Sequence, residues 1–241
     1  MTVLLTVVIG ATFFLSSMIQ GAIGIGFAML ASAAFAFFLP PANSSALIGY
    51  AAVIAGISLS LRMRAYIRMR IALPPLIAMM ITRVLGVVTL MHMDAGLANR
   101  VLGAGLLLFA LYFWLFGERV RIRPTAWKGF LLGLFAGYLG GLYGLTGPFC
   151  AVYFFSALDS GPEYVASMNF AFLPSAFLGL GMHLWYGNIT ASMLPACLLS
   201  VPAVIFGAAL GVRVLRGMDR AQLSRAIYLF MACMGVVLLA I

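Results

Sequence analysis

Residues 126–157 read AWKGFLLGLFAGYLGGLYGLTGPFCAVYFFSA, an apolar run that exceeds one simple membrane crossing and is interrupted by glycine. A second such run covers residues 2–39 and is interrupted by QGAIGIG at residues 20–26. Glycine is conformationally permissive and proline removes a backbone donor, so helices tend to break at such places. Inside a bilayer, broken backbone is tolerated only where protein or a water-filled cavity covers it. Each run therefore predicts a hairpin of two helices, a re-entrant pair or a broken single span.

Most of the remaining chain is also apolar. Of its 241 residues, 65% are hydrophobic and 8% are charged, whereas an average soluble domain has about 25% charged residues. Because a span needs about 20 apolar residues, the chain has room for roughly seven to nine membrane segments and for no sizeable soluble domain. This predicts an all-α, multi-pass protein of the cell membrane, expected to be a bacterial inner membrane. The other apolar blocks cover residues 45–61, 71–91, 97–117, 164–186, 190–212 and 222–241.

The net charge of +9 is concentrated in short loops. Most of the fourteen basic residues form three clusters between apolar blocks, which is the pattern of cytoplasmic loops and not of a nucleic-acid-binding surface. We therefore expect the lipid bilayer as a partner and no nucleic acid. The three cysteines lie in apolar runs without metal-ligand spacing, so neither a metal nor another cofactor is predicted. The clusters are Arg62, Arg64, Arg68 and Arg70; Arg119, Arg121, Arg123 and Lys128; and Arg213, Arg216, Arg220 and Arg225.

Positions in the two halves of the chain match at offsets of 120 and 125 residues. The matched pairs are Gly21/Gly141, Gly24/Gly144, Gly86/Gly211, Met93/Met218, Asp94/Asp219 and Arg100/Arg225. We expect one transmembrane transporter domain, residues 1–241, built from two homologous repeats of about four helical segments each, over about 1–120 and about 121–241. Internal repeats with a broken helix at corresponding places are typical of transporters, which bind substrate there.

The basic loops indicate that the two repeats are inverted. The cluster at residues 62–70 follows the second block of the first repeat, whereas the equivalent loop of the second repeat, 186–189, has no charge. The basic cluster of the second repeat comes one span later, at 213–225. Because basic loops stay in the cytoplasm, the repeats would cross the membrane in opposite orientations. Four single crossings per repeat in parallel orientation is the alternative.

The two Gly-rich segments predict an anion site. A broken helix leaves unpaired N–H groups and a partial positive charge at the new N-terminus, which favours anions. Gly147 and Pro148 fit such a helix start, because proline suits the first turn. Two breaks from inverted repeats would meet near the membrane midplane and hold an anion from both sides. Alternatively, the glycines only allow close helix packing.

Arg83 is a charged residue deep in the apolar block 71–91. A charge there is costly and usually functional, and arginine binds sulfonate or carboxylate through paired hydrogen bonds. A structural ion pair, a carbonyl cap and snorkelling to an interface are the alternatives. Polar residues close to the breaks could donate hydrogen bonds to the anion or join helices. The predicted substrate-binding residues are Gln20, Gly21, Gly24, Gly26, Arg83, Tyr143, Gly144, Thr146, Gly147, Pro148 and Asn169.

These motifs resemble the sulfite exporter TauE/SafE family of membrane transporters along essentially the whole chain. The resemblance rests on the GAIGIG segment at 21–26, on GYLGGLYGLTGP at 137–148 and on the paired Met-Asp…Arg segments. It implies transport of small sulfur-containing or organic anions such as sulfite, sulfonates, sulfoacetate or thiosulfate. Two departures touch the predicted site: no proline closely follows Gly26, and Thr146 stands where the family often has glycine.

The sequence thus predicts a secondary anion transporter that works by alternating access. A passive anion channel, or a subunit of a larger transport complex, is the alternative, and a homodimer is an open possibility. An enzyme is not expected, because no serine–histidine dyad, intramembrane aspartate pair or HExxH motif occurs. His92 and His183 lie near loops, so an interfacial position and a part in proton coupling are both open for them.

Overall fold

The computed structural model describes residues 3–115 and 123–214, together with a few residues between 229 and 239. Within this part of the chain every regular element is a helix, which confirms the all-α prediction. The matched positions Met218, Asp219 and Arg225 lie outside the described residues, as do Arg119, Arg121, Arg216 and Arg220. The elements are α1 (Val3–Ile23), α2 (Phe27–Phe35), α3 (Pro41–Arg62), η1 (Arg64–Tyr66), α4 (Met69–His92), α5 (Ala95–Leu115), α6 (Ala126–Tyr143), α7 (Gly147–Ala157), α8 (Gly161–Trp185), η2 (Ala191–Met193) and α9 (Leu194–Val214).

Six of the described helical segments are long and apolar enough to cross a membrane. They contain α1, α3, α4, α5, α8 and α9, and the last of them includes η2. Their exposed side chains are largely apolar, as lipid contact requires. On α4, for example, Leu73, Ile77, Ile81 and Leu85 recur every four residues and are all exposed, so they form one lipid-facing stripe.

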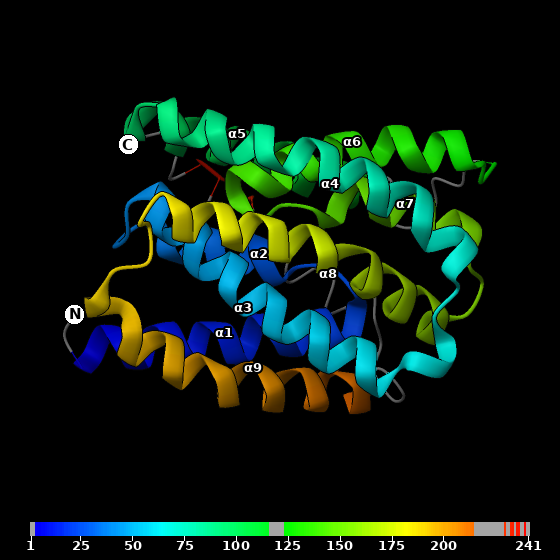
Figure 1. Cartoon of the computed structure of the whole chain (residues 1–241), viewed down its shortest axis with the longest axis horizontal. Helices are drawn as coiled ribbons and strands as arrows, with labels where there is room; N and C mark the ends of the chain where they lie inside the picture. Colours follow the sequence, from blue (N-terminus) through cyan, green and yellow to red (C-terminus); the bar gives the residue numbers. More distant parts are fainter. Residues whose placement is uncertain are drawn as a thin grey trace.

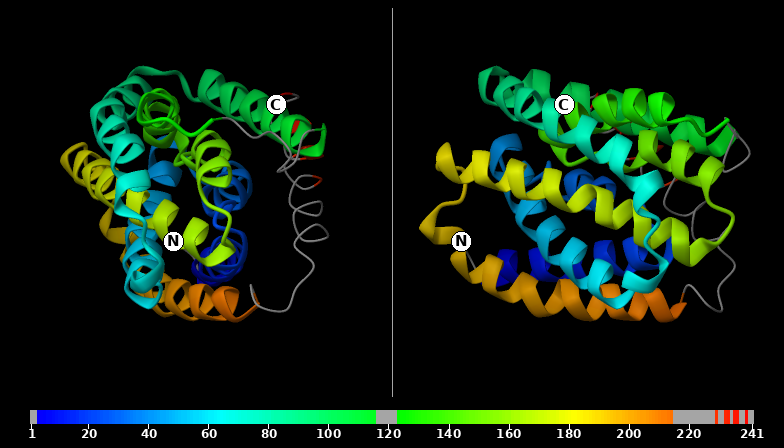
Figure 2. Two further views of the ribbon diagram at one scale, coloured as in Figure 1. Left: turned by 90° about the vertical axis from the view of Figure 1, so that its right-hand side faces the viewer. Right: turned by 45° about the vertical axis from the view of Figure 1, so that its right-hand side comes forward.

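The helices form a bundle in which two parallel pairs flank a central antiparallel pair (Figures 1 and 2). Helices α1 and α9 form one outer pair, and α4 and α6 form the other. Both pairs run parallel, because the contacting residue numbers rise together: Gly10 lies against Leu199 and Gly21 against Gly211, and Gly133 lies against Pro75 and Gly141 against Gly86. The central helices α3 and α8 run antiparallel: Ser45 contacts His183, and Gly56 lies against Leu173.

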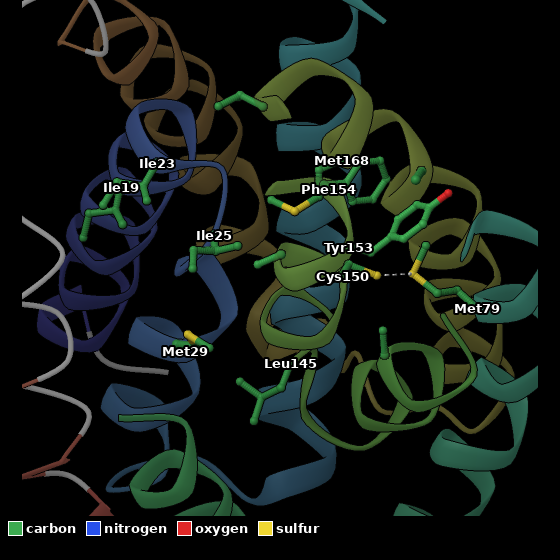
Figure 3. Packing of buried hydrophobic residues seen from close by; sticks show 14 of the residues in the cluster. Ile19, Ile23, Ile25, Met29, Met79, Leu145, Cys150, Tyr153, Phe154 and Met168 are labelled. Carbon is green, nitrogen blue, oxygen red and sulfur yellow. Dashed lines mark hydrogen bonds between the residues drawn. The ribbon is translucent and has the colours of Figure 1, made fainter. Parts of the chain in front are cut away.

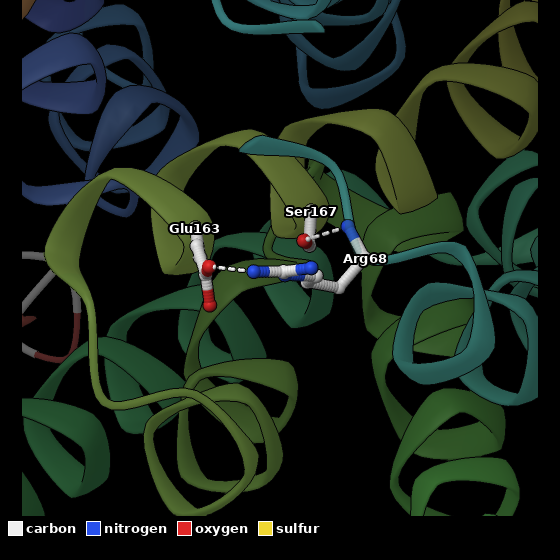
Figure 4. A network of polar contacts seen from close by, with 3 residues as sticks. All are labelled: Arg68, Glu163 and Ser167. Atoms are coloured by element: carbon white, nitrogen blue, oxygen red, sulfur yellow. Dashed lines mark hydrogen bonds and ion pairs between the residues drawn. The ribbon is translucent and has the colours of Figure 1, made fainter. Parts of the chain in front are cut away.

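Contacts across α3 and α8 define the two ends of the bundle. At one end, which we call the basic end, α3 ends and α8 begins, and Arg68 pairs with Glu163 (Figure 4). This hydrogen bond raises the pKa of the Arg68 guanidinium above its usual value. At the other end, called the outer end, Asn43 donates to the backbone oxygen of Asn188 at 2.8 Å. The basic residues at the basic end are Arg62, Arg64, Arg68, Arg70, Arg123, Lys128 and Arg213, which assigns this end to the cytoplasm.

Each Gly-rich run contains a long helix, three non-helical residues and a short helix. Residues 24–26 separate α1 from α2, and residues 144–146 separate α6 from α7. Gly24, Gly26 and Gly144 have φ values of 87°, 108° and 75°, in the left-handed region that glycine adopts without a steric penalty. The short helices fold back: the Phe13 ring of α1 contacts Phe27 and also Phe35, at the two ends of α2.

A buried apolar cluster joins the two helical hairpins, α1–α2 and α6–α7, to α8 (Figure 3). Ile25 and Met29 contribute from the first hairpin, and Leu145 and Cys150 contribute from the second. The Cys150 thiol lies 3.8 Å from the sulfur of Met79, which ties α7 to α4. The two non-helical segments are therefore covered by protein, as a bilayer demands.

We predict that Gly86→Ala strongly destabilises the fold. A Cβ atom at Gly86 would lie 2.1 Å from the backbone oxygen of Tyr138 and 2.8 Å from Gly141 Cα, so α4 and α6 would have to separate. We expect a loss of about 2 kcal/mol or more, measured by thermal unfolding in detergent. Gly105→Ala is the matched control, because nothing lies within 4 Å of its Cβ position. Equal stability of both variants would show that the α4–α6 contact is loose.

Candidate substrate site

A small cavity lies where the two non-helical segments meet α3, α4 and α8. Its volume is ≈ 40 Å³, whereas a single water needs roughly 10–15 Å³. The first segment contacts the start of α7 beside this cavity, because a Cβ atom on Gly147 would lie 3.1 Å from the Ile25 side chain. Most of the sequence-predicted site residues line it: Gln20, Gly26, Arg83, Gly144, Thr146, Gly147, Pro148 and Asn169.

Two helix N-termini border this cavity. Gly26 and Phe27 line it at the start of α2, and Gly147 and Pro148 line it at the start of α7. The first turn of a helix has N–H groups without helical partners, and its dipole places a partial positive charge there. Neither start has a side-chain cap, since Gly26 and Thr146 make no capping hydrogen bond in the described structure. The first turns of α2 and α7 thus contribute partial positive charge beside the cavity.

Arg83 adds a full positive charge to the same cavity. The lipid-facing stripe of α4 lies on one face of this helix, so Arg83 is turned inward, where its side chain is only 2% exposed. The guanidinium lies between two glycines: Cβ atoms at Gly140 and Gly179 would approach it to 2.6 Å and 2.5 Å. Only glycine at both positions leaves room for the guanidinium here.

The charge of Arg83 has no counter-ion in the described part of the chain. Its Nη1 donates a long hydrogen bond of 3.4 Å to Thr146 Oγ1, and its buried Nε has no partner. The ion pair found among the described residues, between Arg68 and Glu163, lies at the basic end. A buried charge without a partner is costly, and a bound anion would remove that cost.

Gln20 and Asn169 bring two amides to the cavity. Gln20 Nε2 donates to Asn169 Oδ1 at 2.7 Å, which joins α1 to α8. The Asn169 amide nitrogen donates to the Val165 backbone oxygen at 2.8 Å. The second amide hydrogen of Gln20 has no partner in the described structure and can donate to an anion.

Three predicted site residues lie outside the cavity lining. Gly21 packs against the Ala208 backbone of α9, and a Cβ atom there would approach Ala208 O to 2.7 Å. Gly24 packs against the ring of Tyr164 and the side chain of Met168. The Tyr143 hydroxyl donates to the backbone oxygen of Ala98 at 2.6 Å. All three positions serve contacts between helices in this structure.

Several lining residues were not predicted from the sequence. Four belong to the first non-helical segment and α2, namely Ile25, Phe27, Ala28 and Met29. The others come from α3 and α8: Ile48, Gly49, Ala52, Gly56, Phe172 and Ala176. The contacts of Gly140 and Gly179 with the Arg83 guanidinium were also not predicted from the sequence. The spacing of Asn169, Phe172, Ala176 and Gly179 along one helical face was the available signal, but it required knowledge of which face of α8 is buried.

Comparison with known families matches the profile of the sulfite exporter TauE/SafE family over residues 9–238. The chain belongs to this family. TauE/SafE proteins are membrane transporters and not enzymes, which fits six candidate spans and a multi-pass position in the cell membrane. Comparison with curated proteins finds no match, and comparison with solved structures finds none either. The family implies transport of sulfur anions such as sulfite.

We predict that Arg83→Met raises the stability of the ligand-free protein by about 1–4 kcal/mol, because an uncompensated buried charge is replaced by an apolar chain of similar length. Thermal unfolding of the purified protein without added anion measures this change. Arg68→Met serves as the control. The Arg68 side chain is 60% exposed, so loss of its ion pair with Glu163 should change stability by about 1 kcal/mol or less. A loss of stability in Arg83→Met would reveal a compensating partner for the guanidinium.

Proposed function

We propose that the chain is a secondary transporter that moves a small sulfur oxyanion by alternating access and holds it between the two Gly-rich segments. The observation that carries this proposal is the Arg83 guanidinium, which is buried beside two helix N-termini without a carboxylate partner in the described structure. This arrangement favours an anion over a cation or a neutral solute. The family supports sulfur anions as its chemical class.

Equivalent contacts in the two halves support an internal duplication over about 1–120 and 121–241. A Cβ atom on Gly21 would approach Gly211, and one on Gly141 would approach Gly86; these are the pairs related by offsets of 120 and 125. Hydroxyl groups join the same helix pairs: Ser17 donates to the Val204 backbone oxygen at 3.0 Å, and Thr82 donates to the Leu134 backbone oxygen at 2.7 Å. The glycine contact of each half has its counterpart in the other half.

The direction of the helices supports inverted repeats. Helix α1 runs parallel to α9 and begins at the outer end, whereas α6 runs parallel to α4 and begins at the basic end (Figure 1). The two hairpins therefore enter the bundle from opposite ends and meet at the cavity. Inverted repeats around a central site are the architecture on which alternating access commonly depends.

The size of the cavity favours a compact anion. A cavity volume of ≈ 40 Å³ holds about three or four water molecules, because each water needs roughly 10–15 Å³. Sulfite or thiosulfate fits this space better than a sulfonate with an organic tail, for which the site would have to expand. The same small size argues against a continuous pore, and therefore against the passive channel.

The first test is anion-dependent thermal stabilisation of the purified protein. We expect sulfite or thiosulfate to raise the unfolding temperature, because a ligand that binds the folded state stabilises it by mass action. Arg83→Ala should lose this stabilisation, whereas Arg100→Ala, a charge removed at an exposed position near the start of α5, should keep it. Saturable counterflow in proteoliposomes then separates a transporter from a channel. No stabilisation by any oxyanion would contradict the proposed function.

We also predict that Gly179→Ala weakens anion binding by about tenfold or more. The new methyl group would displace the guanidinium of Arg83, since its position lies 2.5 Å from Nε. A bidentate contact depends on geometry, so a small displacement has a large effect. Gly181→Ala, two residues along α8 and with nothing within 4 Å, is the matched control. Equal affinities would show that Arg83 does not contact the anion.

A further inference from the structure

His183 is a buried titratable residue that the proposed function leaves without a part. It lies on α8 near the outer end, and its side chain is fully buried. Its Nε2 lies 3.2 Å from Ser45 Oγ on α3, and its Nδ1 lies 3.0 Å from Asn188 Nδ2 after α8. A hydroxyl can donate or accept, and an amide can do either after a flip. The two partners can therefore accommodate both the neutral and the protonated imidazole.

The face of α8 that carries His183 also reaches the cavity. Gly179 precedes His183 by one helical turn and lies against the Arg83 guanidinium. Ala176, almost one further turn away, lines the cavity. The hydrogen-bond partners of His183, Ser45 and Asn188, are neutral. No described carboxylate lies within ion-pair distance of this histidine.

A second, smaller pocket lies beside Ser45 toward the outer end. Its volume of ≈ 10 Å³ is close to the roughly 10–15 Å³ that one water needs. Ile48 lines both this pocket and the anion cavity. The positions 120 residues after Ser44 and Ser45 are Tyr164 and Val165, so neither serine has a serine counterpart in the other half. The polar residues that line the pocket are Ser32, Ser44, Ser45, Asn99 and Tyr143.

We propose that His183 binds a proton that enters the site together with the anion, through water in the pocket beside Ser45. This inference rests on the proposed function and names the coupling ion. In the empty site, a protonated His183 would add a second uncompensated positive charge next to Arg83. A bound divalent anion balances both charges, so it favours proton uptake.

Reciprocity makes this coupling measurable in two ways. Binding of a divalent anion must draw a proton from the solution, and a lower pH must strengthen binding of the same anion. The sign follows from the charge: protonation of His183 adds positive charge to the site, so affinity rises as pH falls. Sulfate and thiosulfate are suitable probes, because both stay divalent over the range in which imidazole titrates.

The experiment adds sulfate or thiosulfate to the purified protein in weakly buffered detergent solution and records proton uptake with a pH indicator. We expect uptake of up to about one proton per bound anion in the wild type, and binding that tightens by up to about tenfold per pH unit as pH falls. His183→Gln should bind with the affinity of the wild type at high pH, without proton uptake and without pH dependence. His92→Gln is the matched control, because His92 is the other histidine of the chain and is exposed.

Three outcomes would overturn the inference. Anion binding without proton uptake in the wild type removes the coupling and leaves the proposed function intact. Uptake that persists in His183→Gln assigns the proton to another group. Absence of binding by either anion in the wild type overturns the inference and the proposed function together. If His183→Gln does not fold, His183→Met takes its place, since Met63 lies at the equivalent position of the first half.

Discussion

The guanidinium of Arg83 is the feature on which the proposed site depends most. It lies inside the bundle without a carboxylate partner in the described chain, and membrane protein interiors do not favour such a charge. Its position is fixed by close helix packing, because α6 and α8 each contribute a glycine, Gly140 and Gly179, beside it. The structure therefore keeps a costly charge at a defined place, which is the usual signature of a site selected for function over stability.

The proposed duplication would explain how this charge and the amides share one cavity. At the offsets that relate the two halves, Arg83 corresponds to Ala208, Gln20 to Gly140 and Asn169 to Gly49. Each of these polar residues thus has a small residue at the equivalent position of the other half. Gly140 gives room to Arg83, and Gly49 lines the cavity near its centre. Symmetric packing builds the frame, and these asymmetric substitutions give the cavity a charged side and an amide side.

The sequence was sufficient to predict an all-α membrane protein and to select Arg83, because both depend on the bilayer as a solvent. It also placed Gly26 and Thr146 in the non-helical segments and Gly147 at a helix start. Gly21, Gly24 and Tyr143 were grouped with them through nearness along the chain, yet helix geometry turns them toward neighbouring helices. Gly179 and Ala176 could not be selected, because their role depends on which face of α8 meets α4.

The difference between the two ends of the bundle bears on how an anion would enter and leave. Toward the outer end, the second pocket presents Ser44 and Ser45 beside Ile48. At the equivalent inner position Gly24 packs against Tyr164 and Met168, and the Tyr164 ring stacks on Phe155 at 4.0 Å. Under the proposed function, an anion and a proton would meet serine hydroxyl groups on the outer route and stacked aromatic rings on the inner one. Under the proposed alternating access, opening toward the basic end would separate α7 from α8. The Arg68–Glu163 pair at that end joins the α3–α4 connection to the same helix.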